Sequence, residues 1–397
     1  MNALIRNGAN VRAGNASGYT ALYFVAGDNQ AASIDFLVGA GADVSVEAEQ
    51  GFTPLHIASL LGRSGAVGSL LKHGADKDFN SSTGATPLHM AADARSHALI
   101  RHGVDVNASN AKGHSPLYEA AARNRVAAIR ALVEAGADVH GLAQEWTPLD
   151  ASCEAGAADA IATLAELGAD LTRTNVNGLI PLQLAVDGGH LDAVNALLEA
   201  GADPNQEFGG KRVLYYSILR SRRDILASLL LHGADVNKKV VGRLTGLNLA
   251  VGLQDAGIVN DLLGAGADVN NGVSYEDMSA LHMACVVPST NIMPTLLSYG
   301  ASIGVRDENG KSPLHYAHTC VSLDLAPTAW TSCWAGADET ARDSDGLTPA
   351  EFAQINFFDE TRGDALARVI IALERAPVDR AWRRRGMVLL CRSFLER

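Results

Sequence analysis

Histidine and cysteine side chains gather in one short stretch of this sequence. His315, His318 and Cys320 lie close together, and Cys333 follows further along. Imidazole nitrogens and thiolates are the usual protein ligands of zinc, so a metal site is the first chemistry to consider. Zinc sites space their ligands in recognisable pairs, and the spacing here matches no such pattern. We therefore predict that the chain binds no metal.

Motifs of the common catalytic sites are missing from the sequence. It contains no Gly-x-Ser-x-Gly motif for a nucleophilic serine, no Walker loop, no His-Glu-x-x-His helix and no dinucleotide-binding glycine motif. His56, His89 and His282 occupy equivalent positions in separate copies of one short motif, so they do not form a catalytic set. We predict that the chain is not an enzyme and needs no cofactor.

A repeat supplies the elements that position these side chains. The triplet Gly-Ala-Asp, or a near copy of it, recurs at spacings of 29 to 36 residues, beginning at Gly8, Gly41, Gly74, Gly103, Gly136, Gly168, Gly201, Gly233, Gly266, Gly300 and Gly336. Such a regular period predicts one structural unit stacked many times. Each glycine follows an apolar helical pattern and is expected to end that helix in the left-handed conformation that other residues avoid.

A second recurring motif marks the start of helices. Its clearest copies are Thr53-Pro54-Leu55-His56, Thr86-Pro87-Leu88-His89 and Ser312-Pro313-Leu314-His315. We expect the Thr or Ser oxygen to accept a hydrogen bond from an amide of the first turn, and proline has no amide to leave unpaired there. Eleven such starts are predicted, near Thr20, Thr53, Thr86, Ser115, Thr147, Ile180, Arg212, Thr245, Ser279, Ser312 and Thr348.

This pattern of helix, turn, helix and hairpin loop resembles the ankyrin repeat family over about residues 1–375. The best copy runs from Pro181-Leu182-Gln183-Leu184-Ala185 to Gly201-Ala202-Asp203. The resemblance implies an all-α solenoid of stacked helix-turn-helix units with short β-hairpin loops and a concave recognition surface. It also implies that the histidine of each cap motif, His315 included, ties a helix start to the adjacent loop.

Composition and chain ends complete the domain assignment. A hydrophobic content of 47% is ample for a continuous core, five scattered cysteines suggest reduced thiols, and no long apolar run predicts a membrane span. We expect a monomer in the cytoplasm or nucleus. The chain opens on residues 3–8, which look like a second helix without its first. Residues 376–397 form a separate basic amphipathic segment, which could cap the last repeat, dock onto a partner or, least expected, lie on a membrane surface.

Two sets of residues are candidates for partner binding. The first is a basic island in a chain of net charge −12, consisting of Lys211, Arg212, Arg220, Arg222, Arg223, Lys238, Lys239 and Arg243 together with Tyr215 and Tyr216. It could be ordinary solvated surface or the contact site for an acidic partner, and nucleic acid is a poor candidate because the chain is acidic overall. The second set comprises large side chains on hairpin tips, which could anchor a partner or pack as spacers: Tyr19, Phe52, His114, Trp146 and Met278.

These observations predict a non-catalytic scaffold or adaptor that binds one or more proteins on its concave and hairpin surfaces. The alternative is a substrate-selecting adaptor, or a fragment, of a larger enzyme assembly such as a ubiquitin ligase or kinase. The cytosolic array of a membrane channel would require membrane spans, which the sequence lacks.

Overall fold

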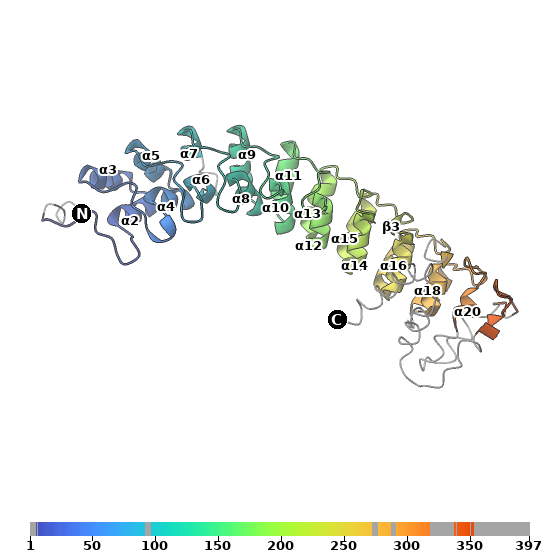
Figure 1. Ribbon diagram of the computed structural model, residues 1–397. Helices are drawn as coiled ribbons and strands as arrows, with labels where there is room; N and C mark the ends of the chain where they lie inside the picture. Colours follow the sequence, from blue (N-terminus) through green and yellow to red (C-terminus); the bar gives the residue numbers. More distant parts are fainter. Residues whose placement is uncertain are drawn as a thin grey trace. The chain divides into compact units, whose positions relative to one another are not determined.

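Helices dominate the computed structural model, which describes residue 5 and residues 7–91, 97–271, 277–286, 291–317, 337–338, 340–349 and 351–352. The chain divides into two compact units, Met1–Asp203 and Pro204–Arg397. Both consist of short helices in antiparallel pairs, as Figure 1 shows. The predicted all-α solenoid of helix-turn-helix units is therefore confirmed.

Unit 1 (Met1–Asp203) is a stack of helix pairs. The first helix of each pair belongs to the row α2 (Ala21–Gly27), α4 (Pro54–Leu60), α6 (Pro87–Met90), α8 (Pro116–Ala122), α10 (Pro148–Ala155) and α12 (Pro181–Gly188). The second helices are α3 (Ala31–Gly39), α5 (Ser64–Lys72), α7 (His97–Arg101), α9 (Val126–Glu134), α11 (Ala158–Glu166) and α13 (Leu191–Glu199). Figure 1 shows the two rows lying against each other. A 3₁₀ turn, η1 (Glu49–Gly51), lies in the loop before α4.

Unit 2 (Pro204–Arg397) repeats this arrangement and adds a small sheet. Its first helices are α14 (Val213–Leu219), α16 (Gly246–Gly252), α18 (Ala280–Val286) and α20 (Pro313–Ala317), and its second helices are α15 (Arg223–Leu231), α17 (Ala256–Gly264) and α19 (Ile292–Ser298). Two consecutive hairpins pair into one antiparallel sheet in the order β1 (Glu207–Phe208), β2 (Lys211–Arg212), β3 (Lys239–Val241) and β4 (Leu244–Thr245). In the described part of unit 1, isolated bridges occur in two of the loops, Gly14 with Thr20 and Ala143 with Trp146.

The sequence of one pair explains why these short helices form. Pro181 opens α12, and the helix ends at Gly189, whose φ of +73° is left-handed. In α13 the buried residues are Ala193, Val194, Leu197 and Leu198, one face of a helix. The chain then turns at Gly201 with φ +96°, where a Cβ would meet nothing within 4 Å. Glycine is thus needed there for its backbone conformation and not for space.

The core lies between the two rows of helices within each unit. The leucine two residues after each cap is at most 3% exposed in nine repeats, at Leu22, Leu55, Leu88, Leu117, Leu149, Leu182, Leu214, Leu247 and Leu281. Burying a leucine side chain stabilises a fold by about 1.5–3 kcal/mol, so these leucines hold each first helix to the stack. The third pair is the shortest, with four residues in α6 and five in α7, and residues 92–96 between them lie outside the described part.

Candidate functional site

The cap histidines connect each repeat to the next. In the second repeat, Nδ1 of His56 accepts a hydrogen bond from the amide of Thr53 at 3.2 Å, and Nε2 lies 3.0 Å from the carbonyl oxygen of Ala85, at the start of the following repeat. The same arrangement recurs for His89 with the carbonyl of His114, for His282 with that of Lys311 and for His315 with that of Leu347. The imidazole therefore joins a helix start to the adjacent loop.

This geometry fixes the protonation state of the ring. Nδ1 accepts the amide proton of Thr53, so it carries no proton, and the proton on Nε2 is donated to the Ala85 carbonyl. Burial lowers the pKa of His56, His89 and His282, which favours the same neutral form. These histidines are structural ties and are unsuited to act as a catalytic base.

The hydroxyl of the cap residue does not always act as the sequence suggested. Thr53 makes no side-chain hydrogen bond to an amide of α4, and its Oγ1 lies 2.9 Å from Nδ1 of His56 instead. Thr86 and Ser312 make the same hydroxyl contact with His89 and His315. The expected acceptance of an amide is found at Ser115, Thr147 and Thr245. At Ser279 the hydroxyl does both, with His282 Nδ1 at 2.8 Å and the His282 amide at 3.5 Å, so contact with the imidazole does not exclude capping of the amide.

Other side chains replace histidine in some repeats. Asn248 accepts the hydroxyl of Thr245 at 3.1 Å and donates from Nδ2 to the carbonyl of Met278 at 3.2 Å, which reproduces the hydroxyl contact of the imidazole and its tie to the following repeat. Asp150 accepts the amide and hydroxyl of Thr147, both at 2.8 Å, and burial raises its pKa. An asparagine can therefore serve as a tie that does not titrate.

Asparagine side chains form a second set of connections, along the hairpins. Asn237 donates to the carbonyl of Gly266 at 3.3 Å and accepts the amide of Asp268 at 2.7 Å. Asn107, Asn205 and Asn270 make the equivalent pair of bonds to their following repeats. The glycines Gly74, Gly136, Gly201, Gly233 and Gly266 have φ between +83° and +96°, so each helix end has the left-handed geometry that such a connection needs.

No group of three or more His, Cys, Asp or Glu side chains within the described ranges could hold a metal ion. His315 forms the tie to Leu347, whereas His318, Cys320 and Cys333 lie outside those ranges. Cys153 and Cys285 are buried and form no disulfide, and burial raises the pKa of the Cys153 thiol. A buried protonated thiol is a poor nucleophile.

The predicted tip residues differ in how much surface they offer. Met278 is only 4% exposed, so it packs in the core of unit 2 and offers little surface to a partner. Phe52 packs against the ring of His56 at 5.6 Å, and His114 packs on Tyr118 at 4.1 Å and contacts Glu119 at 3.0 Å. Trp146 is half-buried in a hairpin closed by its backbone bonds to Ala143.

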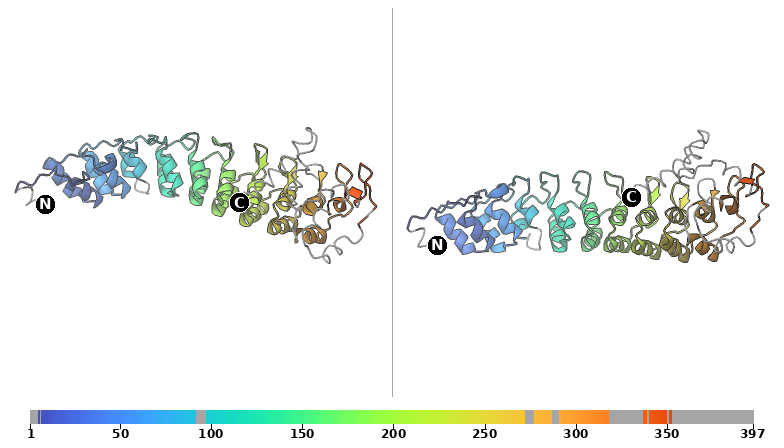
Figure 2. Two further views of the ribbon diagram at one scale, coloured as in Figure 1. Left: turned by 60° about the horizontal axis from the view of Figure 1, so that its bottom comes forward. Right: turned by 90° about the horizontal axis from the view of Figure 1, so that it is seen from below.

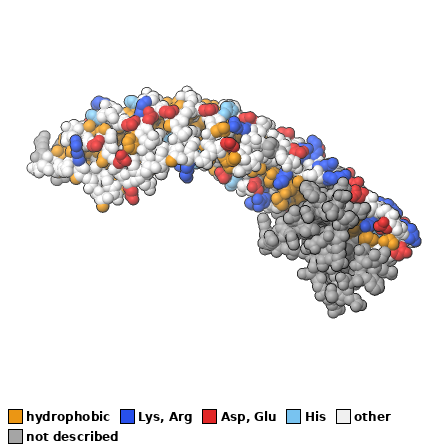
Figure 3. All heavy atoms as spheres, in the orientation of Figure 1, with side chains coloured by type: hydrophobic (Ala, Val, Ile, Leu, Met, Phe, Trp, Pro, Cys, Tyr) orange, Lys and Arg blue, Asp and Glu red, His pale blue; other side chains and the backbone are white. Residues whose placement is uncertain are grey.

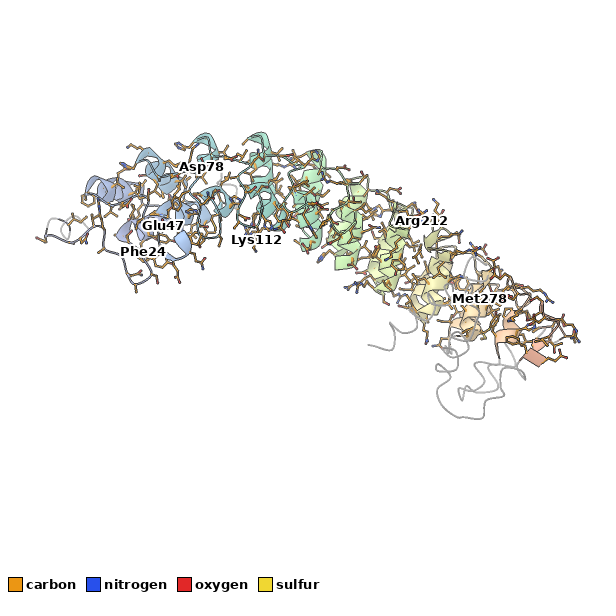
Figure 4. All side chains as sticks on the ribbon, in the orientation of Figure 1. Phe24, Glu47, Asp78, Lys112, Arg212 and Met278 are labelled. Carbon is orange, nitrogen blue, oxygen red and sulfur yellow. The ribbon has the colours of Figure 1, made fainter. Side chains whose placement is uncertain are left out.

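Tyr19 belongs to a cluster that sequence reasoning missed. Its ring lies 4.7 Å from Tyr23 and 6.3 Å from Phe24, and Phe24 is 56% exposed. These rings line a hollow of about 410 Å³ between α2 and α4, which we call the aromatic hollow; it is lined by Tyr19, Tyr23, Phe24, Gly27, Asp28, Ile57, Leu61 and Arg63. Figure 4 labels Phe24 in this part of unit 1. Leu60 and Leu61 beside it are 53% and 43% exposed.

A sequence signal for this hollow does exist. Phe24 and Ile57 are each four residues after a helix cap, and Leu61 is eight residues after one. At 3.6 residues per turn, position four lies about 200° around the helix from the buried leucine at position two, and position eight lies close to position four. Phe24, Ile57 and Leu61 therefore lie on the side of their helices away from that leucine.

The basic island does not form one patch. Arg212 immediately precedes α14 and Arg220 immediately follows it, so the hairpin residues and the helix-turn residues lie at opposite ends of that helix. Figure 3 shows Lys and Arg side chains on unit 2 mixed with Asp and Glu. The hairpin set is Lys211, Arg212, Lys238, Lys239 and Arg243, and the helix-turn set is Arg220, Arg222 and Arg223. The half-buried rings of Tyr215 and Tyr216 meet edge to face at 5.3 Å in α14.

Several of these cations are already paired within unit 2. Arg212 contacts the Glu207 carboxylate at 2.9 Å and also donates to the carbonyls of Lys239 and Asn205. Arg223 forms two bonds with Asp261, at 2.7 and 2.8 Å. Lys238 and Arg243 have looser carboxylate partners, Asp235 at 3.7 Å and Asp277 at 3.6 Å, and Lys211 lies over the Tyr215 ring. An open hollow of about 540 Å³ between these hairpins is lined by residues of both charges, including Glu207, Arg212 and Lys239.

Two further expectations concern membranes and the carboxyl end. Of the helices described, none is long and apolar enough to cross a membrane. The basic segment 376–397 lies outside the described residues.

Comparison with known proteins agrees with the repeat geometry. A family model described as ankyrin repeats (3 copies) matches residues 1–81, 33–109, 64–142, 88–175, 167–240 and 247–327. The chain is 32% identical over 108 residues to ankyrin repeat protein FPV223 of fowlpox virus, covering 27% of this chain and 74% of that protein.

Two other relatives match over shorter shares of their own length. The nuclear factor NF-kappa-B p105 subunit of Gallus gallus is 31% identical over 190 residues, which is 37% of this chain and 19% of that protein. Protein phosphatase 1 regulatory subunit 27 of Mus musculus is 34% identical over 82 residues, which is 21% of this chain and 51% of that protein. The stacked helix pairs, the cap ties and the matches over most of the sequence lead to one conclusion. This chain belongs to the ankyrin repeat family.

Proposed function

We propose that this chain is a non-catalytic scaffold or adaptor, and that it binds partner proteins on its first helices and hairpins. Ankyrin repeats are in general protein–protein interaction modules. The observation that supports binding on this particular surface is the aromatic hollow, whose lining includes the exposed apolar side chains of Phe24 and Leu61. Contiguous exposed apolar surface on a stable scaffold is typical of an interaction site.

Rigid construction favours the same function. The histidine ties and asparagine bonds hold consecutive repeats in register, so the surface is formed before a partner arrives. A preformed surface avoids the entropic cost of ordering loops on binding. We expect the chain to act as a monomer in the cytoplasm or nucleus.

The test is capture of partner proteins by the full-length chain. We expect the double variant Phe24→Glu with Leu61→Glu to lose partners that the wild type retains, because the charges would enter the apolar hollow. Leu231→Glu is the matched control, since Leu231 is 85% exposed on unit 2 and lies far along the sequence from the hollow. Equal capture by all three proteins would contradict binding at this surface.

A second function is a targeting or regulatory subunit of an enzyme assembly. The name of the mouse relative, a regulatory subunit of protein phosphatase 1, is the observation that favours it. In that case a catalytic subunit, with measurable activity, should copurify with the wild-type chain and be lost with the hollow variant. Partners without any associated activity would favour the plain scaffold.

A further inference from the structure

One carboxylate lines the aromatic hollow, and two more lie on the neighbouring hairpin tip. Asp28 lines it directly, and Glu47 and Glu49 lie on the neighbouring hairpin tip. That tip touches the hollow's own loop, because the amide of Glu49 donates to the carbonyl of Ser17, two residues before Tyr19. In the described part of the chain these three side chains make no hydrogen bond or ion pair. Figure 4 labels Glu47 and Phe24 in the same part of unit 1.

Carboxylates outnumber basic side chains in this part of unit 1, and both arginines donate to backbone carbonyls. Residues 7–63 contain five carboxylates and only two basic side chains, Arg12 and Arg63. Arg63 donates to the carbonyl of Gly27 at 2.7 Å, and Arg12 donates to that of Gly41 at 2.8 Å. We call Asp28, Glu47 and Glu49 the rim of the hollow. Arg63 keeps its charge while it donates to a carbonyl, so it offsets one of these three negative charges, and the rest of the lining is largely aromatic and aliphatic.

We infer that the aromatic hollow receives a segment of a partner protein in which an apolar side chain is flanked by lysine or arginine. This inference rests on the proposed scaffold function and specifies its partner. The apolar side chain would bury against Phe24, Ile57 and Leu61, and the flanking cations would face Asp28, Glu47 and Glu49. The faces of Tyr19 and Tyr23 also attract a cation. An acidic segment would meet like charges at the rim and lose affinity.

The experiment is a selection from a displayed library of random dodecapeptides on the immobilised full-length chain. We expect the enriched peptides to combine an aliphatic or aromatic residue with neighbouring Lys or Arg, and to bind more weakly as the salt concentration rises. Phe24→Ser should weaken a selected peptide by about tenfold or more, as removal of an interface anchor does. Because Phe24 is 56% exposed, the variant should unfold at the same temperature as the wild type.

Charge reversal tests the rim separately. Glu47→Lys with Glu49→Lys should weaken the basic peptides by roughly fivefold or more and shift the selection towards acidic peptides. The matched control is Asp192→Lys with Glu199→Lys, which makes the same change in net charge at exposed sites on α13. That control should leave the selection unchanged.

The outcomes separate this inference from the proposed function. Failure to enrich any peptide, enrichment of acidic or uncharged peptides, or equal binding to Phe24→Ser would overturn the inference. A concentration-dependent dimer that Phe24→Ser dissociates would also overturn it, because a second copy would then fill the hollow. In each case loss of captured proteins in the Phe24→Glu, Leu61→Glu variant would still support the scaffold.

Discussion

Replacement of His56 tests the physical role of the cap histidines most directly. The side chain is 1% exposed and connects Thr53 to Ala85 of the next repeat. His56→Ala would leave the Thr53 amide and the Ala85 carbonyl without their partner, and each such buried group costs about 1–3 kcal/mol. We therefore expect the free energy of unfolding to fall by about 3 kcal/mol at pH 7.5.

His56→Asn is the matched variant because the chain already uses asparagine at this position. Asn248 bonds the hydroxyl of Thr245 at 3.1 Å and the carbonyl of Met278, in the next repeat, at 3.2 Å. We expect His56→Asn to lower the free energy of unfolding by no more than about 1 kcal/mol at pH 7.5, because the asparagine side chain fills less volume than the imidazole. A loss as large as that of His56→Ala would refute the claim that hydrogen bonding, and not the ring itself, makes the tie.

The two variants should also differ in pH dependence. Burial lowers the folded-state pKa of His56 from 6.5, so below pH 6.5 the unfolded chain takes up a proton that the folded chain resists. The stabilisation is complete above pH 6.5 and is lost as the pH falls towards the folded-state pKa. Between pH 7.5 and 5.5 one such histidine contributes up to about 1.4 kcal/mol.

Urea unfolding monitored by circular dichroism would measure this difference, with hydrogen exchange of α4 (Pro54–Leu60) reporting the local opening. Wild type should lose more stability between pH 7.5 and 5.5 than His56→Asn, since the remaining titrating groups are common to both proteins. Identical pH dependence would show that His56 is not held neutral by the fold.

Three further predictions concern the scaffold and the island. Gly201→Ala should destabilise the chain by about 1 kcal/mol, because φ is +96° there. Gly39→Ala, at the end of α3 where φ is negative, should be neutral or stabilising. Thermal unfolding would measure both. Asn237→Ala should cost about 1–2 kcal/mol by losing its bonds to Gly266 and Asp268. Asn237→Asp should cost less because its Oδ1 still accepts the Asp268 amide, and equal losses would count against the acceptor bond. If the basic island binds an acidic partner, Arg222→Glu with Lys239→Glu should weaken the binding of that partner without altering the circular dichroism spectrum. Unchanged binding would show that the island is ordinary solvated surface.

Sequence periodicity was sufficient to predict the fold because the repeat reuses a few positions for the same physical task. A proline-led start, a buried leucine at position two and a glycine stop are each readable in one dimension, as at Pro181, Leu182 and Gly201. The contacts that a side chain makes with the next repeat cannot be read from the sequence in this way. That Thr53 would contact an imidazole instead of an amide, or that Met278 would be buried, depends on the neighbouring repeat.

The candidate site was harder to predict because it uses positions that the fold leaves free. In the first, second and fourth repeats position four after the cap is not buried, so its chemistry can change among these repeats at little cost to stability. In later repeats the same position is buried, as at Leu184 and Leu249. In unit 1 it is Phe24, then Ile57, but in the fourth repeat it is Glu119. Only the three-dimensional arrangement shows that the first two line one hollow with Tyr19.

The same reasoning predicts where specificity changes along unit 1. Glu119 is paired with Arg123 at position eight, at 2.8 Å, and with His114 at 3.0 Å, so this repeat has a charged side chain at position four, where the first two repeats have Phe24 and Ile57. An apolar partner side chain that binds against Phe24 and Leu61 would meet charged groups at Glu119. Binding there would require the partner to break the ion pair or to form hydrogen bonds with it. The apolar part of a partner is therefore expected at the first two repeats, and hydrogen-bonding groups are expected further along, because the fold constrains neither set of side chains.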